Sequence, residues 1–339
     1  MTSVVATDSV VLDRLEQQLV RCLQVAPRAP FSLLGEVLGV SEHTVARRYR
    51  RMHRSGVLRV VGVARADALG QSTWTVRIQC RPNGAASLAA ALARRDDVNW
   101  VTLNAGGSEV TCSVQSLSAA ARDHLLVQKL PHTAPVLGVS ASVVLHVFVG
   151  ASVERRWTAL AGLLTRTQER RLRAVVEPVG PLTRSATLDA ADAALLDEFA
   201  RDGRASYATL AAAAGVSEAR AKRRLTALLH QGVAFIETDV TASALGFDSH
   251  AVLWLRVNPA HLQAAGEALA RSSQVAYAAA VTGAYNLSAA VYSRDLDALY
   301  RFVTTEVGSL PGVQGLEISP VLSYLKQAGT LVANDRFVD

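Results

Sequence analysis

The sequence predicts an α+β fold: a tandem repeat of a winged helix-turn-helix domain followed by a ferredoxin-like βαββαβ sandwich. One observation is an internal duplication, in which separated landmarks recur at one constant shift (217 − 41 = 232 − 56 = 176). The landmarks are Ser41 as Ser217, Gly56 as Gly232, Leu12-Asp13 as Leu188-Asp189, and Leu69-Gly70 as Leu245-Gly246. The other observation is the pattern within each unit, where three short amphipathic helices precede apolar strands that alternate with helices. A constant shift across such landmarks indicates two copies of one unit.

Composition limits the classes of function. The chain has 339 residues, enough for two or more domains, and 50% of them are hydrophobic. Its net charge of +6 and pI near 9.5 suit an anionic partner. Cys22, Cys80 and Cys112 are too far apart for a metal motif and are expected to be reduced core thiols. No run of ~18 apolar residues appears, and the acidic start at residues 1–10 does not resemble a signal peptide. We therefore expect a soluble, cytoplasmic protein with no membrane partner, cofactor or metal.

Unit one begins with three predicted helices. Residues 1–10 are expected to be a disordered lead, and leucines at helical spacing predict a first helix over 11–24. A second helix is expected over 31–38, and the turn at Gly39 leads into a third over 40–56. Three short helices joined in this way form a helix-turn-helix unit.

The third helix has two different faces. Ser41 is a suitable N-cap, and Val45, Tyr49 and Met52 share one apolar stripe. At 100° per residue the opposite side carries His43, Arg47, Arg50 and Arg54. A short helix with an apolar base and an arginine ridge has the shape that enters a DNA major groove.

Strands and helices follow in the order of a ferredoxin-like sandwich. The β-branched stretch 57–63 predicts a strand that serves as a wing or an arm. Strands are then expected over 73–80, 98–103, 110–115 and 136–149, with helices over 85–94 and 118–130. Unit two repeats the plan, with helices over 188–200, 207–214 and 217–230, a strand over 235–240, and a second sandwich over 250–322.

These patterns set the expected domain boundaries. The helix-turn-helix domains are predicted over 11–63 and 187–240, the sandwiches over 72–149 and 248–326, and a linker over 150–186. The linker is basic and broken by Pro178 and Pro181, and its apolar residues over 157–164 are expected to be helical. They predict a helix that docks on one unit, and a third contact with the DNA backbone is the alternative.

The repeated motifs resemble the Lrp/AsnC family, the leucine-responsive or feast/famine regulators. The matching stretches are 188–192, 202–206, 215–218 with Arg223-Arg224, and 281–286, and in unit one Leu12-Asp13, 39–42 and Arg47-Arg48. The resemblance covers nearly the whole chain twice. It implies a DNA-binding transcriptional regulator whose partner is double-stranded DNA and whose sandwich domains pair. Two units in one chain resemble a fused dimer with an asymmetric operator, and further pairing into a homodimer or higher assembly stays open.

Base reading requires hydrogen-bond donors on the exposed part of each third helix. In unit one we expect Ser41 to cap the helix, His43, Thr44 and Arg47 to lie near bases, and Arg48, Arg51 and Arg54 to contact phosphates. In unit two the corresponding residues are Ser217 as the cap and Ala219, Arg220 and Arg223 near bases, with Lys222 and Arg224 on phosphates. The ridge of unit two is thinner because Arg50 and Arg51 become Thr226 and Ala227. Unit one is therefore expected to bind DNA more tightly. A solvated charged face is the alternative for both helices.

The resemblance also implies a small-molecule effector, often an amino acid, at the turn between the second and third sandwich strands. In unit two this turn is formed by Val281, Thr282, Gly283, Ala284, Tyr285 and Asn286. The family pattern is similar to Val-Thr-Gly-x-x-Asp, and here Asn286 replaces the acid that would hold an ammonium group. Unit one keeps only the last glycine, Gly107, so a ligand is expected in unit two. A structural hairpin turn without a ligand is the alternative.

The sequence contains none of the common catalytic motifs. There is no nucleophile elbow, no phosphate-binding Gly-rich loop followed by lysine, and no paired-histidine metal motif. We therefore expect a protein that is not an enzyme. The alternative is a sirohaem decarboxylase, a class that resembles the same fold and uses basic residues and histidine between its sandwich domains. The arginine ridge of the third helix favours the regulator, because an enzyme would not need it.

Overall fold

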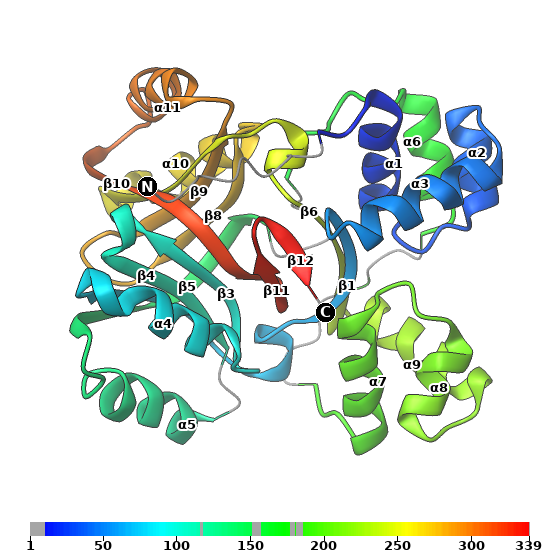
Figure 1. The fold of residues 1–339 in the computed structure, drawn as a ribbon, viewed down its shortest axis with the longest axis horizontal. Coiled ribbons are helices and arrows are strands. Elements are labelled where there is room, and N and C mark those ends of the chain that lie inside the picture. Colours follow the sequence, from blue (N-terminus) through cyan, green and yellow to red (C-terminus); the bar gives the residue numbers. More distant parts are fainter. Residues whose placement is uncertain (1–10, 116–117, 151–156, 177–179, 181–185, 339) are drawn as a thin grey trace, which may run out of the picture.

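The computed structural model describes residues 11–338, except 116–117, 151–156, 177–179 and 181–185 (Figure 1). The expected disordered lead at residues 1–10 lies outside the described residues. Figure 1 shows two helical domains on one side of the molecule and the sheets with their covering helices on the other, with a two-stranded ribbon between them. No helix in the described ranges is long and apolar enough to cross a membrane.

The first helix-turn-helix domain comprises α1 (Arg14–Val25), α2 (Phe31–Leu38) and α3 (Glu42–Arg54). A capping box starts α1, in which Asp13 accepts the amide of Glu16 and the Glu16 carboxylate accepts the amide of Asp13. Leu19, Leu23 and Met52 are among the fully buried side chains of its core. These helices confirm the sequence prediction to within a few residues at each end.

The second domain repeats this construction with α7 (Ala190–Arg201), α8 (Tyr207–Ala214) and α9 (Glu218–His230). Asp189 and Asp192 form the capping box of α7, at the positions that Asp13 and Glu16 occupy in unit one. Phe199 and Leu210 are fully buried at the centre of this domain.

The strand after each helix-turn-helix domain is an arm rather than a wing. Strands β1 (Leu58–Ala64) and β6 (Ala234–Val240) pair antiparallel along their whole length. The arms are exchanged, because Val60 of β1 lies in the core of the second domain and Val240 of β6 lies in the core of the first. Each helical domain therefore completes its own core with a residue from the arm of the other unit.

Each sandwich has the predicted order of elements. The first consists of β2 (Thr73–Cys80), α4 (Pro82–Ala93), β3 (Val98–Asn104), β4 (Glu109–Gln115), α5 (Ala119–Asp123) with a π-helical continuation (His124–Lys129), and β5 (Val136–Val149). The second consists of β7 (Ser249–Val257), α10 (Leu262–Arg271), β8 (Val275–Val281), β9 (Leu287–Ser293), α11 (Leu296–Phe302) with its continuation (Val303–Val307), and β10 (Val313–Gln327). Short 3-10 turns lie at Asp67–Leu69, Ala105–Gly107, Ser243–Leu245 and Pro259–His261.

The two sandwiches pair within the chain. The first half of β5 pairs with β2 and its second half pairs with β8. Likewise, the first half of β10 pairs with β7 and its second half pairs with β3. The strands β10, β3, β4, β2, β5, β8, β9 and β7 therefore form a closed ring. This ring gives the fused dimer that the duplication predicts.

Two further features differ from the prediction. The chain ends in a hairpin that was not predicted, β11 (Thr330–Ala333) and β12 (Arg336–Val338), and the amide of Phe337 donates to the carbonyl of Gly56, 2.8 Å away. The expectation of a helix over 157–164 is wrong. The described part of that stretch forms turns, and the linker helix is α6 (Arg166–Arg173).

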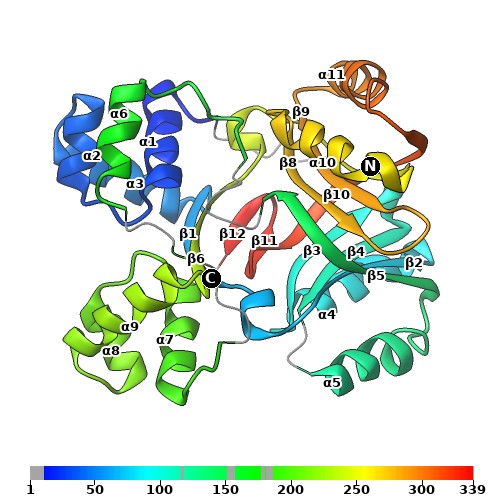
Figure 2. The ribbon, with the colours of Figure 1, turned by 180° about the vertical axis from the view of Figure 1, so that it is seen from behind.

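Helix α6 docks on the first helical domain, as the sequence predicts for a linker helix. Figure 2 shows α6 packed along α1 and α2. Leu172 is fully buried there, and the carboxylate of Glu169 accepts a hydrogen bond from Arg21 at 2.6 Å. The linker prolines Pro178 and Pro181 lie outside the described residues.

Candidate nucleic-acid interface and effector turn

Local sequence fixes where α3 begins. The side chain of Ser41 accepts a hydrogen bond from the amide of Thr44, 3.2 Å away, which satisfies one of the free amides of the first turn. Gly39 ends α2 in the left-handed conformation at φ 68°, as the predicted turn requires. Val45 and Met52 are 1% exposed, so the predicted apolar stripe faces the core.

The opposite face of α3 is exposed. His43, Arg47, Arg50, Arg51 and Arg54 are exposed, and Thr44 is half-buried. The guanidinium of Arg50 donates to the carbonyl of Ala46, one turn earlier. Four arginines and a histidine on one exposed helix face form a strongly cationic surface, which is the electrostatic footprint of a nucleic-acid contact.

Arg48 and Arg51 have partners in the first helix. Arg48 forms ion pairs with Asp13 and Glu16, and Arg51 forms one with Glu16. Glu16 is 2% exposed, so its charge needs these cations. The hydrogen bond and charge of Glu16 also raise the pKa of Arg51. The structure therefore gives both arginines a role in holding α3 against α1, which the sequence analysis did not identify.

Helix α9 has the same arrangement as α3, with fewer cations. Ser217 caps α9, and Arg220, Lys222 and Arg223 are exposed. Arg224, the repeat equivalent of Arg48, forms an ion pair with the buried Asp192. The hydrogen bond that Arg224 donates in this pair is the main reason why the pKa of Asp192 is lowered, and burial of the carboxylate acts in the opposite direction.

A reciprocal clasp joins the two helical domains. Arg28 donates hydrogen bonds to the carbonyls of Gly203 and Ala205, both at 2.8 Å, and Arg204 donates to the carbonyls of Pro27 and Ala29. The two arginines are repeat equivalents (204 − 28 = 176). Sequence reasoning missed the clasp, although an arginine repeated at the duplication shift, in a turn between helices, was the available signal.

Aromatic rings complete the clasp. The guanidinium of Arg28 lies over the ring of Tyr207 at 5.0 Å, and that of Arg204 lies over Phe31 at 4.8 Å. Arg204 also lies 5.5 Å from the ring of Tyr49, which belongs to α3. Burial lowers the pKa of Arg204. The position of α3 is therefore tied directly to the second domain.

The predicted effector turn lies where the two sandwiches meet. Thr282 donates its amide to the carbonyl of Val143 at 3.0 Å, and its hydroxyl accepts the amide of Val143 at 2.9 Å. Gly283 has φ 110°, a conformation that disfavours a side chain. Val281 is buried, Thr282, Gly283 and Ala284 are exposed, and Tyr285 is half-buried.

Asn286 is already engaged by a neighbouring strand. Its side-chain oxygen accepts the amide of Val257 at 2.9 Å, and its side-chain nitrogen donates to the carbonyl of the same residue at 2.8 Å. Both hydrogen-bonding groups of the amide therefore extend the pairing of β9 with β7. The residue that replaces the family's acid works here as a structural side chain.

A polar cluster lies between the sheets. The guanidinium of Arg77 lies 4.5 Å from the ring centroid of Trp254 and forms ion pairs with Glu109, at 2.7 Å, and Glu317. Burial alone would lower the pKa of Arg77, but hydrogen bonds to Glu317 and Glu109 raise it. Each of these four side chains comes from a different strand, so the cluster links both sandwiches.

Comparison with known proteins identifies the repeated domains. The model of the AsnC-type helix-turn-helix domain matches residues 12–53 and again residues 188–229. The model of the Lrp/AsnC ligand binding domain matches residues 250–331. The duplicated matches agree with the duplication seen in the sequence.

Similar curated proteins have the length of one repeat unit. An uncharacterised HTH-type transcriptional regulator from Pyrococcus abyssi (strain GE5 / Orsay) is 28% identical over 148 residues, which are 43% of this chain and 93% of the relative. A second, from Pyrococcus horikoshii, is 28% identical over 150 residues, or 44% of this chain and 94% of the relative. Each relative therefore corresponds to about one unit.

A solved structure matches the whole two-unit arrangement. The siroheme decarboxylase NirDL has a TM-score of 0.61 and is 12% identical, over 93% of each chain. At that identity the match shows a shared fold and nothing about activity. The repeated helix-turn-helix match, the ligand-binding-domain match and the one-unit relatives agree on the identity of these domains. The chain therefore carries two AsnC-type helix-turn-helix domains and an Lrp/AsnC ligand binding domain, and it is similar to HTH-type transcriptional regulators.

Proposed function

We propose that this protein is a sequence-specific DNA-binding transcriptional regulator that reads the major groove with α3 and α9. The observation that carries the proposal is the exposed cationic face of α3, opposite its buried stripe of Val45 and Met52. Two helix-turn-helix domains in one framework supply two such reading helices. We propose that the protein is located in the cytoplasm.

Unit one makes the tighter contact. His43, Thr44 and Arg47 lie near bases, and Arg54 contacts phosphate. Arg48 and Arg51 already pair with carboxylates on α1, so they position the helix and contribute less to phosphate binding than their charge suggests. Arg51 is 60% exposed along its side chain and can still reach a backbone phosphate.

Unit two reads a different half-site. At the repeat shift, Arg220 takes the position of Thr44 and Arg223 takes the position of Arg47. Lys222 contacts a DNA phosphate. Because the clasp and the exchanged arms join the two domains, the spacing between half-sites is fixed by the protein rather than by the DNA. The operator is therefore asymmetric and has one preferred spacing.

An effector, such as an amino acid, acts through the turn formed by residues 281–286. Support comes from the exposed Thr282 and Gly283 and from the hydrogen bonds that tie the turn to β5 of the other sandwich. Because Asn286 is engaged by Val257, it does not supply a charge to the ligand. Ligand carboxylates would be held by backbone amides at this turn.

Selection of bound sequences from random DNA, followed by gel shifts at several salt concentrations, tests the function. We expect two unlike half-sites at one spacing, and an affinity that falls steeply with salt. Recovery of no enriched motif, together with binding that is insensitive to salt, would remove the regulator proposal.

The second candidate is a tetrapyrrole decarboxylase, favoured by the fold shared with NirDL over 93% of each chain. Such an enzyme needs free basic groups between its sandwiches, and Arg77 at that location is paired with two carboxylates. The regulator is therefore the better-supported function. Purified protein with the absorption of a bound tetrapyrrole, or decarboxylation of iron-uroporphyrin-type substrates, would favour the enzyme.

A further inference from the structure

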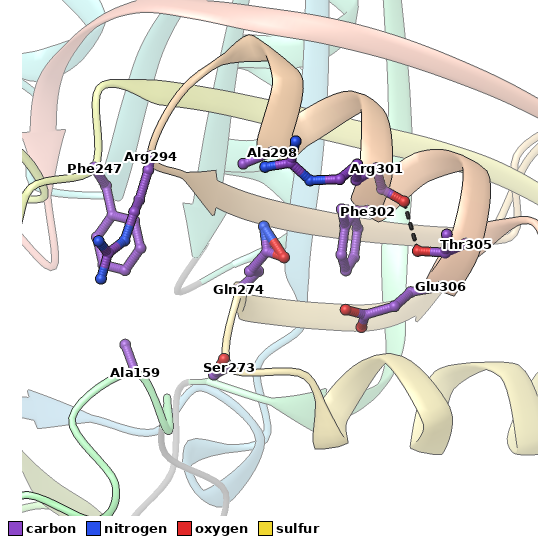
Figure 3. Close-up of a pocket in the computed structure, with 10 residues that line it drawn as sticks. All are labelled: Ala159, Phe247, Ser273, Gln274, Arg294, Ala298, Arg301, Phe302, Thr305 and Glu306. Atoms are coloured by element: carbon purple, nitrogen blue, oxygen red, sulfur yellow. Dashed lines mark hydrogen bonds between the residues drawn. The ribbon is translucent and has the colours of Figure 1, made fainter.

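A cavity of about 370 Å³ lies on the second sandwich, at the end of the β8–β9 hairpin that is opposite to the turn at residues 282–286 (Figure 3). It is lined by residues just before β8, just after β9, on α11 and in the linker. The side chains that matter here are Phe247, Gln274, Arg294, Arg301, Phe302 and Glu306. A volume of this size is within the range of small-molecule sites, roughly 300–1,000 Å³.

The charged groups of the cavity have no partners among the residues that the structure describes. Among the described residues, the guanidinium groups of Arg294 and Arg301 and the carboxylate of Glu306 make no hydrogen bond or ion pair. Isolated surface charges are common, but these three converge on one hollow. Figure 3 shows Arg294 beside Phe247 at one end, Glu306 at the other, and Arg301 above.

The middle of the cavity is shaped for a short organic stem. Phe302 and Phe247 supply aromatic surface, and Gln274 lies between them. The side-chain nitrogen of Gln274 donates to the hydroxyl of Ser293 at 3.0 Å, which fixes the amide and leaves its oxygen toward the Glu306 end. That end therefore offers two acceptors for a cationic group, while Arg294 at the other end and Arg301 above offer guanidinium groups for carboxylates.

We propose that this cavity binds a small amino-dicarboxylate, the chemistry of an acidic amino acid. Two carboxylates match Arg294 and Arg301, the ammonium matches Glu306 and the Gln274 oxygen, and the methylene stem lies on Phe302. The ligand's single net negative charge balances the single net positive charge of the three cavity residues. This site is distinct from the turn at residues 281–286.

Unit one has no counterpart of this set. The N-cap residues Asp295 and Ser118 align the two helices at a shift of 177 (295 − 118), which places His124 at the position of Arg301 and Lys129 at that of Glu306. The charge at the second position is reversed. One repeat has thus acquired a ligand site that the other lacks, and the chain binds one ligand here.

Two residues that line the cavity also contact Trp157 of the linker. Trp157 donates its indole N–H to the carbonyl of Ser273 at 2.8 Å, and its ring lies 5.5 Å from that of Phe247. Three residues later, Leu160 is buried in the core of the first helical domain. A ligand that moves Phe247 or Ser273 therefore acts on the segment that leads to α1 and α3. This step, unlike binding itself, rests on the proposed function.

Calorimetry and intrinsic fluorescence of the full chain without DNA test the site. The probes are L-glutamate and L-aspartate, with glutarate and succinate as analogues that lack the ammonium, and L-glutamine as the analogue with one carboxylate. We expect an acidic amino acid to bind, to raise Tm by about 5 °C when it is near hundredfold saturation, and to change Trp157 emission. The analogues should bind at least tenfold more weakly.

Matched variants decide whether binding occurs in this cavity. Arg294→Gln with Arg301→Gln should remove binding, whereas the control Arg271→Gln, which removes one positive charge at the end of α10 outside the lining, should leave it unchanged. No binding of either acidic amino acid by the wild-type chain at millimolar concentration overturns the proposal. Equal binding by the double variant and the wild type also overturns it, even if gel shifts show the chain to be a DNA-binding protein.

The coupling has its own test. Trp157→Phe should still bind the acidic amino acid but should lose the ligand-dependent change in affinity for the selected operator. A change in DNA affinity that persists in Trp157→Phe would overturn the linker route while leaving the binding site in place.

Discussion

Arg28 and Arg204 each hold the backbone of the other's turn, so that two residues separated by one repeat length form a reciprocal pair across the helical domains. Arg28 donates to the carbonyls of Gly203 and Ala205, and Arg204 donates to those of Pro27 and Ala29. Hydrogen bonds from a charged donor contribute about 1.5–3 kcal/mol each when buried. The pair therefore sets how far apart the reading helices lie.

Removing the clasp should loosen operator spacing. We expect Arg204→Ala to lower the free energy of unfolding by about 2–3 kcal/mol, because two buried carbonyls lose their donors. Binding to operators with one or two inserted base pairs should improve relative to the wild type. Arg201→Ala is the control. Among the described residues Arg201 pairs only with Glu198, at the surface, so its loss should cost less than ~0.5 kcal/mol. An unchanged spacing preference would show that the arms alone fix the geometry.

Arg47 and Arg48 are neighbours with different expected roles. Arg47→Ala should weaken binding to the selected operator by about 1–3 kcal/mol, weaken binding to random DNA less, and leave Tm unchanged, because its side chain is exposed. Arg48→Ala should lower Tm, because Asp13 and the buried Glu16 lose a cation. Gel shifts and thermal melts measure both. Equal losses on specific and random DNA would assign Arg47 to a phosphate contact.

Gly56 should be less tolerant of a side chain than Gly39. Both have positive φ, 66° and 68°, so each alanine carries the same backbone strain of about 1 kcal/mol. A Cβ at Gly56 would also lie 2.4 Å from the carbonyl oxygen of Phe337, whereas a Cβ at Gly39 meets nothing within 4 Å. Gly56→Ala should therefore lower the free energy of unfolding by about 1–2 kcal/mol more than Gly39→Ala does. Equal losses of unfolding free energy in the two variants would mean that the terminal hairpin moves away from the added Cβ at no cost.

Asp192→Asn should destabilise the protein in a pH-dependent manner. The hydrogen bond from Arg224 lowers the pKa of Asp192 below its usual 3.8, so the folded state favours the charged form. The stabilisation is therefore present above about pH 4 and is lost as pH falls through the lowered pKa. Because Arg224 is partly exposed, we expect a loss of only about 1 kcal/mol at pH 7. The stabilities of the two proteins, measured by urea unfolding, should converge as the pH falls through this lowered pKa.

Asp239→Asn should stabilise the protein at high pH, in contrast to Asp192→Asn, which should destabilise it. Burial, together with the charge of Glu237, raises the pKa of Asp239 to about 8, and the side-chain amide of Gln327 opposes this by donating to its carboxylate. The folded state thus holds a proton that the unfolded chain releases near pH 4. Stability from this group is present below that pH and is lost as pH rises through 8. The variant should melt about 3 °C higher than the wild type at pH 8.5, with a smaller difference at pH 5.

Local patterns predicted most elements because each has a strong signal. The strands Thr73–Cys80 and Val136–Val149 match their predicted bounds, since β-branched residues between turn residues give a clear strand signal. The turns over 157–164 show the limit of this approach. Their leucines have helical spacing, but burial against another domain satisfies it without a helix.

The site was less predictable than the fold. Exposure of Arg47 followed from its place on the helix, whereas the engagement of Arg48 by Asp13 depends on how two helices pack. Asn286 likewise has the expected position in the turn, and only the neighbouring strand reveals that Val257 uses its amide. The cavity near Arg294 is lined by residues from four separate segments, so no single sequence motif predicts it.

The closed ring of strands has a consequence for how operator occupancy depends on protein level. A regulator assembled from two separate chains loses its active form on dilution, so its effect rises with roughly the square of its concentration when it is scarce. Here the partners are synthesised together as one polypeptide. The pairing of the two sandwiches therefore does not depend on how many copies of the protein the cell holds.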